Sequence, residues 1–294
     1  MSQSRVSPAS ALLRIGVPVL VGALVTAAIA VDGPTSGGLP LAWWVAGIAL
    51  AVNWMAFIPS WLRHTEHFYD LTGTVSYLAV VVVALIVNPS PGPRAWLVAL
   101  LVGIWTLRLG SFLFGRVRKA GGDQRFTSVV HDPLAFLGWW TTQALWVVLT
   151  LAAGTVALGS SGTEADIDAW AVVGAVVWVA GFAFEAVADR QKSTFRSHPD
   201  NKGRYITTGL WAWSRHPNYF GEIVLWIGVT IIAVPTLSGW RWVALVSPVF
   251  VTVLLTRISG IPLLERSANR RWGEEATYQE YRDRTPLLIP RPPR

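Results

Sequence analysis

The chain has 294 residues, of which 52% are hydrophobic and only 14% are charged. Soluble domains usually carry about 25% charged residues, and the apolar residues here form long unbroken runs, so the composition excludes an ordinary soluble domain and indicates a polytopic membrane protein. The chain has no cysteine, which excludes thiol catalysis, disulfides and cysteine–metal sites.

A membrane helix needs about 20 apolar residues. The sequence contains eight candidate runs, at residues 15–31, 39–58, 71–87, 95–114, 134–158, 169–187, 220–237 and 242–255. The eighth is short and contains Pro248, and the first also fits a signal peptide because Arg5 and Arg14 precede it. The seven later runs favour an uncleaved first helix. We predict an all-α fold, a single membrane domain over residues 1–294 built as a bundle of seven to eight transmembrane helices.

Charge in the loops predicts the orientation. The net charge is +7, and the positive residues gather in residues 115–133, in residues 188–218 and in the tail after Arg257, whereas residues 159–168 carry only negative charge. The positive-inside rule then puts both termini in the cytoplasm, with the chain in the inner (plasma) membrane. This distribution fits contact with membrane lipid and argues against a nucleic-acid partner.

The tail from residue 264 to 294 is polar. We expect it to be helical from Leu264 to about Tyr281 and to end in an extended, proline-rich strap, residues 286–293, that lies against the cytoplasmic face. Prolines at this density exclude a membrane helix there.

Two polar pairs flank the loop between the sixth and seventh runs. Glu185 and Asp189 are four residues apart, as are Asn218 and Glu222, so each pair shares one face of a helix. The pairs could line one pocket. The structural alternative is that Asp189 caps a helix end and that Glu222 pairs with an arginine.

Basic residues fill the stretch between those pairs: Arg190, Lys192, Arg196, Lys202 and Arg204. They are either topology signals or, beside carboxylates and an amide, ligands for a phosphate-rich nucleotide, since the arginine fork binds two phosphate oxygens at once. The sequence has neither a G-x-G-x-x-G motif nor a P-loop, so a Rossmann site is not indicated.

Four other residues are candidates for a chemical or structural role. His64 and His67 could chelate a metal, but the spacing is not H-E-x-x-H and no further ligand is evident, so we expect no metal site. Asp70 fits a helix N-cap. Arg108 lies inside the fourth run, where a bundle-facing role is favoured over snorkelling.

With these residues in hand, the chain resembles the steroid 5α-reductase family of membrane reductases. The similarity is strongest over residues 185–222 and continues to Pro290, including the stretch from Tyr281 to Pro290. It implies a seven-helix bundle that binds NADPH from the cytoplasmic side. The cofactor-binding positions it implies are Glu185, Asp189, Arg196, Arg204, Asn218, Glu222, Arg257 and Tyr281. At Glu185 the steroid reductases have Asn instead.

The resemblance also implies a substrate end. Steroid reductases hold the substrate carbonyl with a Glu and a Tyr; the Tyr position falls on Trp105 here, and the Glu position falls close to Asp70, beside Tyr69. The implied chemistry is hydride transfer from NADPH to a double bond conjugated to a carbonyl. The implied substrate is a lipophilic small molecule such as a sterol, another isoprenoid or a fatty enoyl lipid.

Two alternatives remain open. Isoprenylcysteine and phospholipid methyltransferases, which use S-adenosylmethionine, share the R-H-P-x-Y signature that runs here from Arg215 to Tyr219. A transporter or a non-enzymatic assembly factor would also use deep charges such as Arg108 and Glu222. The sequence does not indicate an oligomeric state.

Overall fold

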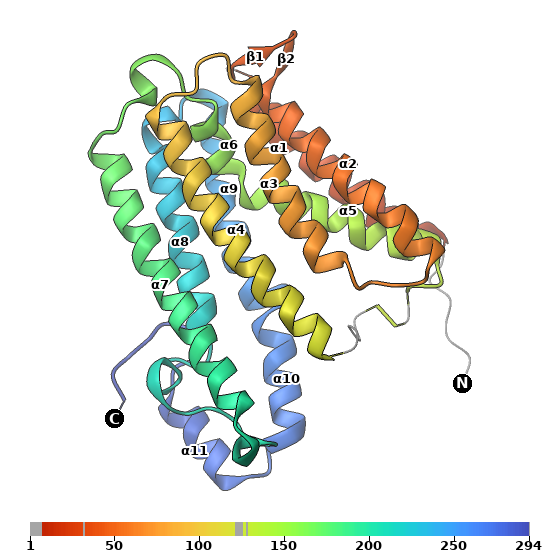
Figure 1. Ribbon diagram of the computed structural model, residues 1–294, viewed down its shortest axis with the longest axis vertical. Coiled ribbons are helices and arrows are strands. Elements are labelled where there is room, and N and C mark those ends of the chain that lie inside the picture. The colour runs from red at the N-terminus through yellow and green to blue at the C-terminus, as the bar shows by residue number, and fades with distance from the viewer. Residues whose placement is uncertain (1–7, 32, 121–125, 128, 294) are drawn as a thin grey trace. The chain divides into compact units, whose positions relative to one another are not determined.

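The computed structural model describes residues 8–31, 33–120, 126–127 and 129–293, and it is built almost entirely of helices (Figure 1). Within that part of the chain, seven helical segments are long and apolar enough to cross a membrane, and the bent pair α5–α6 raises the number to eight if it is counted as one span. The all-α, polytopic fold class is therefore confirmed. The long single helices are α1 (Pro8–Ala30), α2 (Leu41–Leu62), α3 (Tyr69–Val87), α4 (Pro93–Ala120), α7 (Ala169–Ser197) and α8 (Pro217–Ala233).

Shorter elements complete the described part of the chain. The bent pair is α5 (Pro133–Thr150) and α6 (Ala152–Leu158), and the last apolar segment combines the 3-10 turn η5 (Gly239–Leu245), α9 (Val246–Val253), the π-helical turn η6 (Leu254–Ile258) and α10 (Ile261–Trp272), followed by α11 (Ala276–Arg284). Four further 3-10 turns are η1 (Gly162–Ala165), η2 (Pro199–Asn201), η3 (Gly209–Ala212) and η4 (Val234–Thr236). Strands β1 (Thr35–Ser36) and β2 (Leu39–Pro40) form one hairpin.

The hairpin turn requires its two glycines. Gly37 and Gly38 both have positive φ, at 59° and 79°. A two-residue turn with positive φ at both positions matches the twist of antiparallel strands. Thr35 therefore pairs with Pro40, and Ser36 with Leu39.

The chain divides into two compact units. The first comprises residues 1–170 and 232–247, and the second comprises residues 171–231 and 248–294.

In the first unit, α2 packs against α3 and α5, α3 packs against α4, and α1 packs against α5. Buried side-chain hydrogen bonds support this packing. Asn53 of α2 is fully buried and donates to the carbonyl of Ala49 at 2.8 Å and to the hydroxyl of Ser76 on α3 at 3.0 Å. Trp54 donates to Thr141 of α5 at 3.1 Å. Polar contacts of this kind hold membrane helices together, because lipid is as apolar as the helix surfaces and the hydrophobic effect does not favour helix–helix contact.

A buried arginine fixes one end of the same unit. Arg94 in the first turn of α4 is only 1% exposed. Its guanidinium donates to the carbonyls of Glu164 at 2.7 Å, Asp166 at 2.9 Å and Ile232 at 2.5 Å, and it forms a salt bridge with Asp168 at 3.0 Å. A buried charge is tolerated when its donors are satisfied in this way.

The fifth apolar run is bent rather than straight. Its two helices meet at an angle of 56°. Asp132 caps the start of α5 by accepting from the amides of Leu134 and Ala135. At the bend, the carbonyl of Thr150 accepts a hydrogen bond from the hydroxyl of Ser247, so this backbone oxygen is satisfied outside the helix.

Two predicted boundaries were wrong. Helix α7 continues to Ser197 instead of ending near residue 187, so Asp189 lies inside the helix and not at its end. The tail helix predicted from Leu264 to Tyr281 is two helices, α10 and α11, separated after Trp272. Arg, Lys, Gln and Glu side chains are good helix formers, so a helix can continue through these polar segments in water.

Candidate functional site

Helices α7 and α8 pack backbone against backbone through glycine. A methyl group at Gly181 would lie 2.5 Å from the backbone nitrogen of Leu225, and one at Gly221 would lie 2.5 Å from that of Glu185. A methyl at Gly228 would meet the α7 backbone at 2.6 Å. Small residues allow this close approach in membrane bundles, and no other residue type fits. The register between the two helices is therefore fixed.

This register sets the level of the two polar pairs. Gly221 approaches Glu185, whereas Gly228, later in α8, approaches Trp178, earlier in α7. The two helices are therefore antiparallel. One turn nearer the connecting loop, Asp189 reaches the level of the start of α8, where Asn218 lies. Glu185 and Asp189 are buried, at 2% and 5% exposure, and Asn218 and Glu222 are half-buried. The structure thus places both polar pairs at the same level of the α7–α8 interface.

The basic residues after Asp189 stand on the helix and beyond its end. Lys192 lies over the ring of Trp211, with 4.3 Å between its Nζ and the ring centroid. Arg196 occupies the last turn of α7, and Arg204 follows in the connecting segment; both are exposed. Cations are favoured at the C-terminal end of a helix. The guanidinium groups of Arg196 and Arg204 are also accessible from water.

The connecting segment, residues 198–216, is folded onto α7. Gln191 accepts from the amide of Leu210 at 2.9 Å, and Trp211 donates from its indole to the carbonyl of Ala188 at 3.0 Å. Gly209 has φ +62°, and a methyl group there would lie 2.6 Å from the Gln191 side chain. Gly209 is therefore required by the turn and is not a free hinge.

An aromatic cluster joins this segment to the tail. The ring centroid of Tyr205 lies 5.5 Å from that of Trp272, 4.9 Å from that of Tyr278 and 5.8 Å from that of Tyr281. The hydroxyl of Tyr281 donates to the carbonyl of Trp211 at 2.8 Å. Burial raises the pKa of Tyr281 above its usual value, so the hydroxyl keeps the proton that it donates. Tyr281 holds the connecting segment in place.

The C-terminal strap docks on the residues before α8. The amide of Arg215 donates to the carbonyl of Pro286 at 2.9 Å, and the amide of Arg291 donates to the carbonyl of Trp213 at 3.0 Å. The strap has no helix beyond Arg284, as predicted. Its contact with residues 213–215 ties it to the R-H-P-x-Y signature.

Two residues of that signature, Arg215 and His216, take part in an ion network. Glu265 on α10 contacts Arg215 at 2.5 Å and the Nε2 atom of His216 at 2.8 Å. His216 is 4% exposed, and its ring stacks parallel to that of Tyr219 with 5.8 Å between centroids. Burial lowers the pKa of His216, although Glu265 opposes the shift. The signature is visible in the sequence, whereas Glu265 was not predicted as part of the site.

Arg257 lies in an irregular part of the last apolar segment. The π-helical turn η6 carries it, and its side chain is exposed. After this turn, a methyl at Gly260 would lie 2.5 Å from the carbonyl oxygen of Leu255 and 3.0 Å from the ring of Tyr219. The α9–α10 junction therefore packs against the start of α8, and π-helical turns occur often at functional sites.

The predicted substrate-end residues lie in the first unit. Tyr69 is 2% exposed, and its hydroxyl donates to the carbonyl of Trp139 at 3.0 Å. Asp70 is half-buried as the second residue of α3, and Phe68 occupies the N-cap position without a side-chain hydrogen bond. The N-cap role considered for Asp70 was wrong.

Trp105 is buried in α4 with its ring edge-on to Tyr77, at 5.2 Å between centroids. Tyr77 follows Tyr69 by two turns of α3, which is about 12 Å of helix rise. Trp105 thus meets α3 at a different level from Tyr69. Arg108, one turn further along α4, is half-buried.

Among the residues that the structure describes, no cluster of three or more His, Asp or Glu side chains could hold a metal ion. His64 instead faces His131, with 4.7 Å between ring centroids. His64 also has φ 48°, in the left-handed region.

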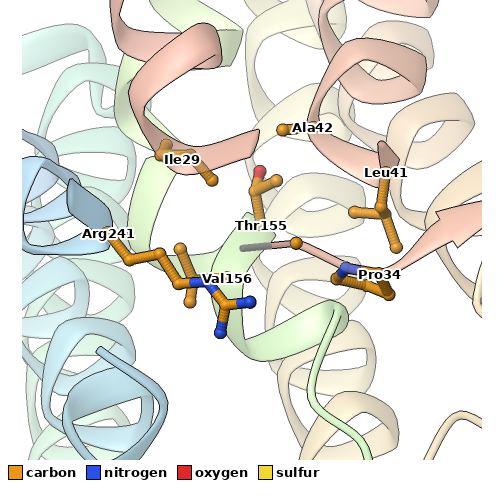
Figure 2. A pocket seen from close by; sticks show the side chains of 8 residues that line it. Ile29, Pro34, Leu41, Ala42, Thr155, Val156 and Arg241 are labelled. Carbon is orange, nitrogen blue, oxygen red and sulfur yellow. The ribbon is translucent and has the colours of Figure 1, made fainter. Parts of the chain in front are cut away.

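A small pocket in the first unit contains none of the predicted site residues. It is lined by Ile29, Gly33, Pro34, Leu41, Ala42, Thr155, Val156 and Arg241. Figure 2 shows the guanidinium of Arg241 reaching in beside Val156, opposite Pro34 and Leu41. The lining is apolar apart from Arg241 and Thr155, so it offers few groups to bind a dinucleotide.

Comparisons with known proteins give one family and one partial relative. A probable O-methyltransferase, ustE, from Ustilaginoidea virens is 34% identical over 73 residues, which are 24% of this chain. The chain spans only about a quarter of the length of that curated relative, 26%. No solved structure matches. The family described as "Protein of unknown function (DUF1295)" matches residues 56–285. Because this match covers most of the chain, the protein belongs to that family, a group of membrane proteins similar to steroid 5α-reductases.

Proposed function

We propose that this protein is an NADPH-dependent reductase of a carbon–carbon double bond conjugated to a carbonyl, acting on a lipophilic, steroid- or isoprenoid-like substrate. One observation carries the proposal: the buried carboxylates of Glu185 and Asp189 stand on α7 just before the exposed guanidinium groups of Arg196 and Arg204, all in one compact unit. The family's similarity to steroid 5α-reductases supports it.

The side chains of the second unit suit the parts of a dinucleotide. Arginine forks bind phosphate oxygens, carboxylates accept from ribose hydroxyls, and an amide both donates to and accepts from a carboxamide. We therefore assign Arg196, Arg204 and Arg257 to the phosphates, Glu185 and Asp189 to ribose hydroxyls, and Asn218 with Glu222 to the nicotinamide end. Tyr281 supports the connecting segment from behind.

NADPH, when bound, supplies the hydride. The protein's part is to orient the nicotinamide, exclude water and polarise the substrate carbonyl as negative charge develops on its oxygen. We assign the polarising role to Asp70. The hydroxyl of Tyr69 already donates to the Trp139 carbonyl, which leaves it no second proton to give.

Asp70→Asn should lower turnover by about 100-fold or more, because general acids contribute about 10²–10⁴-fold. Cofactor affinity should stay unchanged. NADPH oxidation with enone lipids measures the first, and fluorescence titration measures the second. Glu66→Gln, an acidic residue just before α3, is the control and should retain turnover. A loss of cofactor binding in Asp70→Asn would reassign Asp70 to structure.

The second candidate function is methyl transfer from S-adenosylmethionine. It is favoured by the partial similarity to a probable O-methyltransferase and by the R-H-P-x-Y signature from Arg215 to Tyr219. S-adenosylmethionine has one carboxylate and no phosphate, however, so it offers the exposed Arg196 and Arg204 fewer anionic oxygens than NADPH does. For this reason we place the reductase first.

A titration separates the two functions. Detergent-solubilised protein should bind NADPH saturably, NADH more weakly and S-adenosylmethionine not at all. Tryptophan fluorescence measures the binding in each titration. Arg196→Ala and Arg204→Ala should each weaken NADPH binding about 10- to 100-fold, because a charge-assisted contact contributes about 1.5–3 kcal/mol. Arg284→Ala is the control, an exposed cation paired with Glu280 at 3.3 Å. Saturable S-adenosylmethionine binding without any NADPH response would establish the methyltransferase instead.

We further propose that the cofactor site faces the cytoplasm from the inner (plasma) membrane, as the loop charges indicate. The chain has no cysteine, so single cysteines report cleanly. Ser197→Cys, exposed at the end of α7, should resist an impermeant thiol reagent added to intact cells, whereas Ser161→Cys, exposed beside η1, should react. Labelling of Ser197→Cys from outside would reverse the orientation.

A further inference from the structure

His216 is held on three sides within the second unit. Its Nε2 atom lies 2.8 Å from Glu265, its backbone amide donates to the hydroxyl of Ser214 at 3.1 Å, and its ring face stacks on Tyr219. The remaining polar atom, Nδ1, is buried and has no hydrogen-bond partner among the described residues. A buried polar atom without a partner is costly enough to need an explanation.

The neighbours of His216 determine what Nδ1 can do. Glu265 also contacts Arg215 at 2.5 Å, and a carboxylate held by an arginine accepts hydrogen bonds but donates none. Nε2 must therefore carry the proton of the imidazole. Flipping the ring would remove Nε2 from Glu265, so the ring orientation is fixed as well.

Nδ1 is consequently a hydrogen-bond acceptor. Burial lowers the pKa of His216, which keeps the imidazole neutral at neutral pH. A neutral imidazole with its proton on Nε2 presents a lone pair at Nδ1. This acceptor sits immediately before Pro217, the first residue of α8, and two residues before Asn218.

The nicotinamide end of a dinucleotide offers two kinds of donor, ribose hydroxyls and carboxamide N–H groups. Carboxylates are the stronger acceptors for hydroxyls, and Glu185 and Asp189 supply them on α7. The carboxamide is the neutral donor that remains for a neutral acceptor. Asn218, assigned to the same end of the ligand, is the nearest site residue in the chain.

We propose that Nδ1 of His216 accepts a hydrogen bond from the carboxamide N–H of the nicotinamide, and that Glu265 is the positioning residue that holds the imidazole in the required tautomer. This inference rests on the proposed NADPH-dependent function. It adds two residues, on the segment before α8 and on α10, to the specificity of that site.

Two substitutions distinguish the roles of the two ring nitrogens of His216. His216→Gln keeps an N–H near the Nε2 position for Glu265 but removes the acceptor at Nδ1. His216→Asn keeps an oxygen near the Nδ1 position but gives up Glu265. The ligands are NADP⁺ and its 3-acetylpyridine analogue, in which an acetyl group replaces the carboxamide and no N–H remains. Tryptophan fluorescence measures both affinities, independently of turnover.

Wild-type protein should bind NADP⁺ roughly tenfold more tightly than the analogue, the effect of one buried hydrogen bond. His216→Gln should bind both ligands equally, with only NADP⁺ binding weakened, while His216→Asn should keep part of the preference. Glu265→Gln should reduce the preference and change the ¹⁵N signals of His216 from the Nε2–H tautomer to a mixture.

The outcomes distinguish this inference from the proposed function. If wild-type protein binds NADP⁺ but His216→Gln weakens both ligands equally, or neither, the carboxamide contact is disproved and the cofactor assignment stands. If wild-type protein binds neither ligand, both are overturned. An unchanged melting temperature for His216→Gln would show that its loss of preference is not a loss of folding.

Discussion

Gly221→Ala should lower the apparent melting temperature of the solubilised protein by roughly 10 °C. The added methyl would lie 2.5 Å from the backbone nitrogen of Glu185 and 2.6 Å from the carbonyl oxygen of Gly181. Backbone atoms cannot rotate away as a side chain can, so we expect about 3 kcal/mol of overpacking. At about 2–4 °C per kcal/mol for a protein of this size, the shift follows.

The matched control is Gly103→Ala in α4. A methyl there meets nothing within 4 Å, and alanine is favoured over glycine in a helix by about 1 kcal/mol. Its melting temperature should be unchanged or slightly higher. Gly221→Ala should also weaken NADPH binding, because the same contact keeps Glu185 at the level of α8. Equal melting temperatures for the two variants would disprove the backbone contact.

The membrane spans were predictable because lipid imposes a simple requirement. Backbone polar groups must be satisfied internally, so a span needs a long apolar helix. Each of the eight runs found in the sequence corresponds to a helical segment. The bend after Thr150 was not predictable, because the carbonyl at the bend is satisfied by Ser247, which lies far away in the sequence.

Hydropathy also placed the end of α7 too early. The residues from Asp189 to Arg196 read as a loop because they are charged, yet they continue the helix into water for about two turns. A helix in water is limited by propensity and packing rather than by hydrophobicity, and Phe195 of this extension packs against the cluster formed by Ala188, Ile206 and Trp211. Arg190, Lys192 and Arg196 therefore lie on the helix and not in a loop, whereas Arg204 lies in the connecting segment, as predicted.

The polar pairs on α7 and α8 were predictable from spacing alone, since residues four apart share a helix face. The contact between those helices left a signal that was missed. Gly174 and Gly181 are seven residues apart, as are Gly221 and Gly228, and this repeat faces the partner helix. Glu265 left no comparable signal, because its partners lie 49 and 50 residues away and nothing local marks it.

Truncation of the chain after Arg271 should abolish NADPH binding while the membrane spans remain inserted. The deletion removes Trp272, Tyr278 and Tyr281 from the aromatic cluster, together with the hydroxyl that holds the carbonyl of Trp211. It also removes the strap that bonds to residues 213–215. The connecting segment would then lose its support on the side away from α7, and with it the placement of Arg204.

Truncation after Arg291 is the matched control. It deletes only residues 292–294 and keeps the hydrogen bond from Arg291 to the Trp213 carbonyl. We expect at least a 100-fold loss of NADPH affinity in the longer deletion and none in the shorter one, measured by tryptophan fluorescence. Membrane extraction and the melting temperature of each variant report whether the spans have assembled. An NADPH affinity that survives the deletion after Arg271, in a chain that is inserted and folded, would show that the tail takes no part in forming the cofactor site.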